Sequence, residues 1–425
     1  MRVATFNVEN LAPTDPPAKF ARLAGLIVDN LKAPDVLAIE EIQDNNGTTN
    51  DATVSASTTW GMLIAAIQST GGPAYDYRQI DPVDDQDGGA PGGNIRQGLL
   101  FRTDRGLSFV DRPGGGSATA NGVVGSGSAT HLLYSPGRIA PTNAAFNASR
   151  KPLAAEFMFR GHRLFLVANH FNSKGGDDPL FGRFQPPVRS SEPQRQQQAQ
   201  LTHDFIGDIV SADPNAEIVV MGDLNDFEFS DTVTTLKGTP TILEDLIDTL
   251  PPAERYSYVF EGNSQTLDHI LFSTPLFNAH QFEYDVVHVN AEFADQASDH
   301  DPQVARITIF GFSGFLQPVD NLPVLNLVTS GRAVPVKFSL GGNQGLNIFA
   351  AGYPRSEQIA CESSAAVEGV EKTVTAGGSS LSFDATTDQY NYVWKTDKAW
   401  AGTCRQLVVK FIEGTTQRAN FQFGK

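Results

Sequence analysis

The sequence predicts two units, an α/β unit over residues 1–309 and a small all-β sandwich over residues 324–425, joined by residues 310–323. Apolar strand patterns alternate with helical patterns up to residue 309, whereas only short alternating runs between Gly-rich turns follow. Charge divides the chain in the same place. Residues 1–309 carry 21 basic and 39 acidic side chains, and residues 310–425 carry 10 and 9.

The elements of the first unit follow from their apolar periods. Helices carry apolar residues three and four positions apart, and buried strands are short apolar runs. We therefore expect helices over residues 20–31 and 60–67, and a third capped by Ser191 with Pro193 in its first turn. The expected strands are residues 3–8, 35–39, 98–101, 153–159, 163–168, 218–221, 267–272 and 304–309.

The second unit is predicted to contain strands only, at residues 334–340, 389–395, 406–412 and 419–423. Both cysteines of the chain, Cys361 and Cys404, lie in this unit. A pair confined to one small unit favours a disulfide and hence an oxidising compartment. Two buried free thiols are the alternative.

Composition excludes several classes of protein. The net charge of −17 excludes a basic protein that coats nucleic acid. No stretch approaches the roughly 18 uninterrupted apolar residues that a membrane span requires. The first residues resemble a strand and not a signal peptide. Together with the expected disulfide, this predicts a trimmed piece of a secreted protein, located outside the cell or at its surface, and we expect a monomer.

Six polar clusters follow or open apolar strands of the first unit. They contain Asn, Glu, Asp and His without cysteine, which suits Mg²⁺ or Mn²⁺, with Ca²⁺ as a third candidate. Carboxylates with two histidines are also what metal-assisted phosphoester cleavage needs. Taken singly, each cluster is explained by a turn or a core histidine, so their order and shared chemistry carry the prediction. The clusters are residues 6–10, 39–42, 169–172, 222–226, 267–270 and 298–302.

In this order, the clusters resemble the endonuclease/exonuclease/phosphatase superfamily of DNase I-like metallohydrolases, closest to its bacterial extracellular nuclease-like branch. The resemblance covers about residues 1–309. It implies a four-layer α/β/β/α sandwich, in which two packed mixed sheets are flanked by helices and the active site lies at one edge.

The resemblance implies a metal site formed by Glu41 and Asp299, with Glu9 as a further carboxylate. Glu40 occupies the place of a family Gln, so the choice between Glu40 and Glu41 stays open.

The resemblance also implies the catalytic residues. Asn7 would orient the site, and Asp223 would align the nucleophile or aid the leaving group, while Asn225 holds phosphate. Asp268 would polarise His300, the general base for in-line attack by water. His170 would then protonate the leaving oxygen, although the acid and base labels of the two histidines can be exchanged.

Substrate contacts are expected from basic residues, because nuclease surfaces meet successive phosphates. Arg150 matches a phosphate-contacting position of the family, and Lys174 and Arg183 lie in a long polar loop with Phe181 and Phe184. A solvated surface cation is the alternative for each. The candidates are Arg96, Arg102, Arg150, Lys174, Arg183, Arg189 and Arg195.

The predicted function is a secreted, metal-dependent DNA endonuclease without sequence specificity, with RNA as the alternative nucleic acid. A phosphatase or phosphodiesterase acting on a small or phospholipid substrate is the second hypothesis, because one fold serves many substrates. A catalytically silent binding protein is the third.

The second unit resembles the PxKF-type Ig-like module of secreted bacterial proteins over about residues 312–425, on the motif at residues 331–340. Cys361 and Cys404 would bridge it. Gly402 stands where antibody-type domains have a Tyr. We expect an accessory module, whose ligand the sequence does not identify.

Overall fold

The computed structural model describes the chain except residues 160–161, 362–366, 370–379, 413–414 and 425. It divides into two compact units, Met1–Ile307 and Thr308–Lys425.

The first unit contains a six-stranded mixed sheet. Its central pair, β1 (Arg2–Leu11) and β2 (Val36–Ile42), is parallel. Strand β17 (Gln303–Thr308) pairs antiparallel with β1, and β4 (Arg96–Phe101) pairs antiparallel with β2. The edges are β16 (Gln281–Val286) and β3 (Asp76–Arg78).

A second sheet of seven strands packs against the first. Strands β10 (His162–His170) and β11 (Glu217–Asp223) are parallel at its centre. Strand β15 (Asp268–Ser273) pairs antiparallel with β11, and β9 (Leu153–Phe159) with β10. The outer strands are β12 (Leu243–Asp245), β5 (Leu107–Phe109) and β8 (Gly137–Arg138). Strand β1 touches β11 and β15, and β2 touches β10 and β11, so the two sheets lie face to face.

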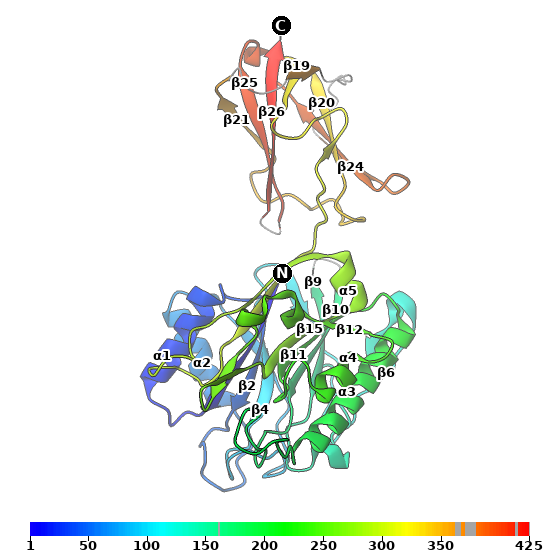
Figure 1. Ribbon diagram of the computed structural model, residues 1–425. Helices are drawn as coiled ribbons and strands as arrows, with labels where there is room; N and C mark the ends of the chain where they lie inside the picture. Colours follow the sequence, from blue (N-terminus) through cyan, green and yellow to red (C-terminus); the bar gives the residue numbers. More distant parts are fainter. Residues whose placement is uncertain (160–161, 362–366, 370–379, 413–414, 425) are drawn as a thin grey trace. The chain divides into compact units, whose positions relative to one another are not determined.

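Helices cover the outer faces of both sheets (Figure 1). Helices α1 (Pro17–Gly25) and α2 (Ser57–Ser69) share an apolar core with β1 and β2. Helices α3 (Glu192–Ala212) and α4 (Asp231–Lys237) share another with β10 and β11. The order of layers is therefore α/β/β/α, a DNase I-like fold. Further elements are a π-helical turn at Leu26–Asn30, α5 (Thr274–Ala279), and the hairpins β6 (Val123–Val124) with β7 (His131–Leu132) and β13 (Tyr258–Phe260) with β14 (Asn263–Gln265).

Helix α3 differs from prediction in how it begins. Ser191 is the residue before the helix and Pro193 lies in its first turn, but the Ser191 side chain makes no capping hydrogen bond. Its hydroxyl instead donates to Asp177 Oδ2 at 2.7 Å and receives a hydrogen bond from Arg195 Nη1. The charged Arg195 guanidinium thus donates to this oxygen in place of the helix amides.

The second unit is a pair of β-sheets without an α-helix in its described residues. One sheet has the order β18 (Phe315–Leu316), β20 (Ala333–Phe338), β24 (Gln389–Lys395), β23 (Leu381–Asp384). The other has the order β21 (Arg355–Ile359), β25 (Cys404–Lys410), β26 (Thr416–Gly424), β19 (Leu325–Thr329), β22 (Val367–Gly369).

Residues 310–323 contribute to the second unit and are not the linker that we expected. Phe310, Phe315 and Val319 are buried in its apolar core, and Phe315 pairs with Phe338 of β20. Three large apolar side chains are more stable in a core than in an exposed linker, which explains why the unit begins before residue 324.

The predicted disulfide between Cys361 and Cys404 is present, with a Cα–Cα separation of 5.3 Å. It joins the chain after β21 to the first residue of β25, next to the paired residues Ile359 and Cys404. Within the described part of the chain, none of the helices combines the length and apolar character needed to cross a bilayer.

Candidate active site

The polar clusters meet at one edge of the two sheets because of strand direction. Asn7 lies near the end of β1, opposite Glu40 of β2, and His170 at the end of β10 lies opposite Asp223 of β11. Asp268 opens β15 opposite Asp223. Since parallel strands end at the same edge and the sheets pack together, side chains distant in sequence reach a common place.

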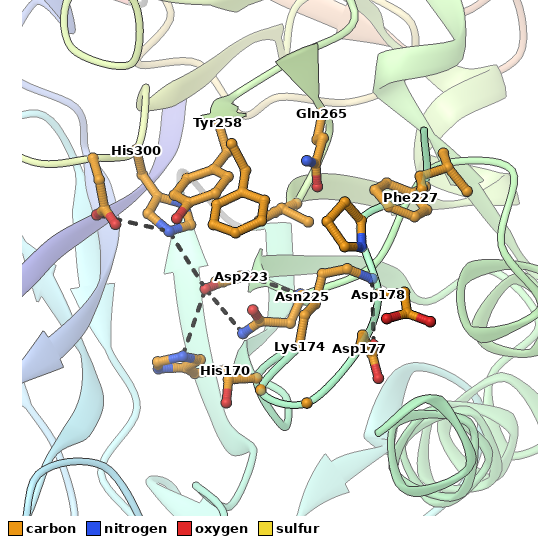
Figure 2. Close-up of a pocket in the computed structure, with 18 of the residues that line it drawn as sticks. His170, Lys174, Asp177, Asp178, Asp223, Asn225, Phe227, Tyr258, Gln265 and His300 are labelled. Carbon is orange, nitrogen blue, oxygen red and sulfur yellow. Dashed lines mark hydrogen bonds and ion pairs between the residues drawn. The ribbon is translucent and has the colours of Figure 1, made fainter. Parts of the chain in front are cut away.

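A cleft of about 480 Å³ occupies this edge (Figure 2). Seven of the predicted site residues line it, namely Glu41, His170, Lys174, Asp223, Asn225, Asp299 and His300. Four others do not line it, namely Asn7, Asp268, Glu9 and Arg150. Asn7 is hydrogen-bonded to Asp223, and Asp268 to His300. Glu9 and Arg150 interact through their charges with Asp299 and Glu41, respectively.

Asn7 links the two sheets at the base of the cleft. Its side-chain amide donates to Glu41 Oε1 and to Asp223 Oδ2, both at 3.1 Å. Asn7 is buried, and its own Oδ1 accepts from the backbone N–H of Glu9 at 3.0 Å. A single amide thereby sets the separation of two carboxylates that come from different sheets.

Asp223 and Asn225 are held by the turn that follows β11. Asn225 donates from its backbone to Asp223 Oδ1 at 2.8 Å and from its side chain to Asp223 Oδ2 at 3.1 Å. The turn requires Gly222, whose φ is 134° and where a Cβ atom would lie 2.0 Å from the Asn169 carbonyl oxygen. Glu41 and Asn225 have φ values of 64° and 50°. Such left-handed backbone in non-glycine residues gathers at functional sites.

His300 is paired with Asp268. Its Nδ1 lies 2.7 Å from Asp268 Oδ2, which also accepts from the Ser257 hydroxyl at 2.7 Å. Burial by itself would lower the pKa of His300, but the charge and hydrogen bond of Asp268, with Asp223 and Asp299 nearby, raise this pKa well above its ordinary value. This environment favours the protonated imidazole, whose Nε2 lies 3.9 Å from Asp223 Oδ2.

His170 has the opposite electrostatics. Burial, followed by the charges of Arg150 and His300, lowers the pKa of His170 well below its ordinary value and so favours the neutral imidazole. Its Nε2 lies 3.5 Å from Asp223 Oδ2 and 3.8 Å from Glu41 Oε1. Burial raises the pKa of Asp223 to about 7, opposed by His300 and assisted by Asp268.

The structure separates the two adjacent glutamates. Glu41 lines the cleft, whereas Glu40 is fully buried and accepts from the Thr5 hydroxyl at 3.0 Å. Burial and the charge of Asp268 raise the pKa of Glu40 well above its ordinary value. Glu41 is thus the glutamate that is available to a cation.

The expected metal set of Glu41, Asp299 and Glu9 differs from the groups that the structure assembles. Among the described residues, the candidate groups at the cleft are Glu41, His170 and Asp223, and also Asp223, Asp268 and His300. Strand β1 has an irregular register with β2 between Asn7 and Leu11, and within this segment Glu9 has a φ of 51°. Burial and the charge of Asp299 raise the pKa of the Glu9 carboxyl.

The predicted substrate-binding cations have different environments. Arg150 is buried, and its guanidinium donates to the Phe171 carbonyl and not into the cleft. Arg183 is exposed and lies over the Phe184 ring, with its guanidinium carbon 4.6 Å from the ring centroid. Lys174 lines the cleft, 3.5 Å from Asp226 Oδ1 and 4.2 Å from the Phe227 ring centroid. Only Lys174 of these three meets the cleft directly.

Comparison with known proteins agrees with this arrangement. Residues 4–300 match the endonuclease/exonuclease/phosphatase family. The chain belongs to this family. It is therefore a hydrolase of phosphoester bonds.

Solved structures with similarity to this member of the endonuclease/exonuclease/phosphatase family each cover 72% of the chain. A family protein from Leptotrichia buccalis is 14% identical over 99% of its length, with a TM-score of 0.47. The endonuclease/exonuclease/phosphatase from Bacteroides vulgatus is 18% identical over 97%, with a TM-score of 0.43. D. rerio TDP2 complexed with single strand DNA product is 16% identical over 97%, with a TM-score of 0.44. No curated protein matches the chain.

Several residues of this family member's cleft were not singled out from the sequence. Tyr258 of the β13 hairpin lies beside His300, with ring centroids 4.9 Å apart. Phe227, Phe260 and Gln265 also line the cleft. Ser257 also supports the cleft, because its hydroxyl donates to Asp268 Oδ2. Ser298, which opens the predicted cluster at residues 298–302, donates to the Asn7 carbonyl. Apart from Ser298, no polar motif marks these residues, so only the long loop before α3 gave a sequence signal for part of the wall.

Proposed function

We propose that this chain is a divalent-metal-dependent endonuclease that cleaves DNA without sequence specificity. The observation that carries the proposal is the convergence of Glu41, His170, Asp223, Asn225 and His300 on one cleft from four different strands and their flanking turns.

The residues of the cleft fit a divalent cation. Glu41, His170 and Asp223 each place one ligand atom within 4.8 Å of the others. Carboxylate oxygens are the donors that Mg²⁺ and Mn²⁺ favour, so Glu41 would hold the cation, with Asp299 of the same cleft as a second carboxylate. When bound, Mg²⁺ or Mn²⁺ supplies Lewis-acid stabilisation of charge on the phosphoryl oxygens.

The protein's own groups account for the proton transfers. In the proposed mechanism, the Asp223 carboxylate, oriented by Asn7 and Asn225, accepts a proton from the attacking water. The new bond forms from water oxygen to phosphorus, and the bond from phosphorus to the leaving oxygen breaks. His300, protonated and oriented by Asp268, gives its Nε2 proton to the leaving oxygen. The raised pKa of His300 and the lowered pKa of His170 favour His300 as the acid, in place of the expected roles of His300 as base and His170 as acid. Asp223, and not His170, is the base in this mechanism.

An extended polymer fits the surroundings of the cleft better than a small ester does. The loop that lines the cleft up to Leu180 continues directly into Phe181 and Phe184, whose side chains are 74% and 53% exposed. Exposed aromatic rings stack on unpaired bases at about 1–3 kcal/mol per base. Arg183, stacked on Phe184, adds a cation at the same place. Since the chain has a net charge of −17, binding is expected to be weak and cation-dependent.

The test is a substrate panel with the full chain. Supercoiled plasmid, single-stranded RNA, a chromogenic phosphodiester, a phosphomonoester and sphingomyelin are each incubated with Mg²⁺, Mn²⁺, Ca²⁺ or chelator. We expect plasmid nicking that chelator abolishes and that Glu41→Ala and His300→Ala each reduce by about 10²-fold or more. Turnover of sphingomyelin or the monoester with intact plasmid would establish the small-substrate hypothesis instead. No turnover of any substrate would favour a silent binding protein.

We further propose that the protein is a monomer of the bacterial extracellular nuclease-like branch and acts outside the cell, with a PxKF-type Ig-like module as its second unit. The Cys361–Cys404 disulfide supports an oxidising location. Detection of the native protein in the culture medium, and not in the cytoplasm, checks the location, and light scattering checks the monomer.

A further inference from the structure

A second cluster of metal-ligating side chains lies in the first unit, away from the catalytic cleft. His162 opens β10, Glu217 opens β11, and His280 follows α5. Glu217 Oε1 lies 3.3 Å from His162 Nδ1 and 3.0 Å from His280 Nε2. The two imidazole rings meet edge to face, with centroids 5.9 Å apart. Three segments that are distant in sequence thus bring two imidazoles and one carboxylate together.

This cluster is separate from the catalytic centre. Glu217 and Asp223 are the first and last residues of β11. Six residue steps along a strand, at about 3.3 Å each, put them roughly 20 Å apart. The parallel pairing of β10 with β11 places the starts of both strands, and therefore His162 and Glu217, at the edge of the sheet opposite His170 and Asp223.

The arrangement suits a transition metal. We propose that His162, Glu217 and His280 form a second metal site that binds Zn²⁺ or a similar divalent first-row cation. Their ligand atoms lie within 4.8 Å of one another. Glu217 Oε2 is buried and accepts no hydrogen bond from the described residues, which leaves one carboxylate oxygen for a further interaction. Imidazole nitrogens with a carboxylate are ligands of Zn²⁺, whereas Mg²⁺ and Ca²⁺ favour oxygen donors.

The role of the site would be structural. The three side chains are 23%, 17% and 11% exposed, so a cation can reach them from solvent while the ligands remain held by the surrounding chain. A cation bound there would tie the starts of β10 and β11 to the connection between α5 and β16. None of the three side chains lines the catalytic cleft, which separates the site from catalysis.

The test measures metal content and stability of the full, disulfide-bonded chain. After chelation and dialysis against Zn²⁺, wild type is expected to retain one more Zn²⁺ per chain than His280→Ala and His162→Ala. Saturating Zn²⁺ should raise the Tm of the wild type by roughly 4 °C, as ligand at 100 times its Kd would for a unit of this size. Neither variant should show this rise. His131→Ala, which removes a histidine from the β6–β7 hairpin, is the matched control and should behave as wild type. Plasmid nicking should be unchanged in both cluster variants.

A measurement on the wild type keeps the proposal testable if a variant does not fold. Zn²⁺ should protect His162 and His280 from diethylpyrocarbonate, as read by mass spectrometry, while His131 stays reactive. Equal Zn²⁺ content in wild type and folded variants, or equal labelling of His162 and His280 with and without Zn²⁺, would overturn the second site. Neither result bears on nicking in Mg²⁺, so this proposal and the proposed nuclease function can fail independently.

Discussion

Asp268→Asn is the sharpest test of how the cleft works, because it changes a charge without changing shape. Asp268 lies behind His300, and its Oδ2 is 2.7 Å from His300 Nδ1. Asparagine keeps an oxygen that can accept from His300 and from the Ser257 hydroxyl. The variant therefore retains the geometry and removes the negative charge that raises the pKa of His300.

The size of the effect follows from that contact. A buried hydrogen bond to a charged group contributes about 1.5–3 kcal/mol, which corresponds to a fall in kcat of roughly 10- to 150-fold. The pH profile should move as well. If His300 donates a proton, activity falls as pH rises through its pKa, and without the Asp268 carboxylate this fall should occur at lower pH.

The assay is plasmid nicking in Mg²⁺ across pH, with unfolding by urea as a second readout. Asp245→Asn is the matched control, because Asp245 holds His269 in an equally buried pair at 2.7 Å that does not line the cleft. We expect Asp245→Asn to lose stability but to keep kcat and its pH profile. An Asp268→Asn variant with wild-type kcat and an unshifted profile would refute the assignment of Asp268 as the residue that orients and charges His300.

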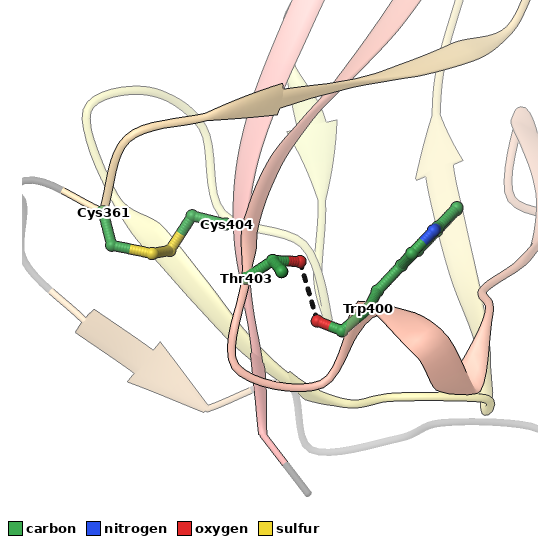
Figure 3. Close-up of a disulfide and its surroundings, with 4 residues drawn as sticks. All are labelled: Cys361, Trp400, Thr403 and Cys404. Carbon is green, nitrogen blue, oxygen red and sulfur yellow. Dashed lines mark hydrogen bonds between the residues drawn. A yellow bond between two sulfur atoms is a disulfide. The ribbon is translucent and has the colours of Figure 1, made fainter.

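Two further predictions concern stability. Burial alone would lower the pKa of His269, but Asp245 and the Asp226 carbonyl raise it to about 9. The native state therefore binds the proton more tightly than the unfolded state, so a stabilisation of up to about 3 kcal/mol is fully present below pH 6.5 and is lost as pH rises through 9. Urea unfolding at pH 6 and pH 9.5 checks this, and Asp245→Asn should flatten the difference. The disulfide of the second unit (Figure 3) joins residues 43 positions apart. Loop entropy predicts that Cys361→Ser with Cys404→Ser lowers the unfolding free energy of this unit by about 4 kcal/mol, and unchanged denaturation of the double variant would contradict that.

Most strands and the polar clusters were predictable because they depend on short-range patterns. Strand β11 ends in Gly222-Asp223, and a polar residue after an apolar run marks a strand end in any fold. The choice between Glu40 and Glu41 was not predictable, since adjacent strand residues point to opposite faces and only packing shows which face is open. The burial of Arg150 was not predictable either. A basic residue at a position where the family contacts phosphate is expected to be accessible, but its guanidinium is buried and donates to the Phe171 carbonyl.

Sequence patterns were enough to predict two units, the strands and helices that carry the polar clusters, the types of donor at each strand end and the cysteine pair. These properties are local or compositional, so they can be inferred without knowing the tertiary contacts. The folded structure was needed to show which donors share a cleft, which carboxylates line it, which histidine has the raised pKa, and where the second unit begins. Those properties depend on burial and on distances between segments far apart in the chain, and a shifted pKa or a ligand set arises only once the folded chain has brought such segments together.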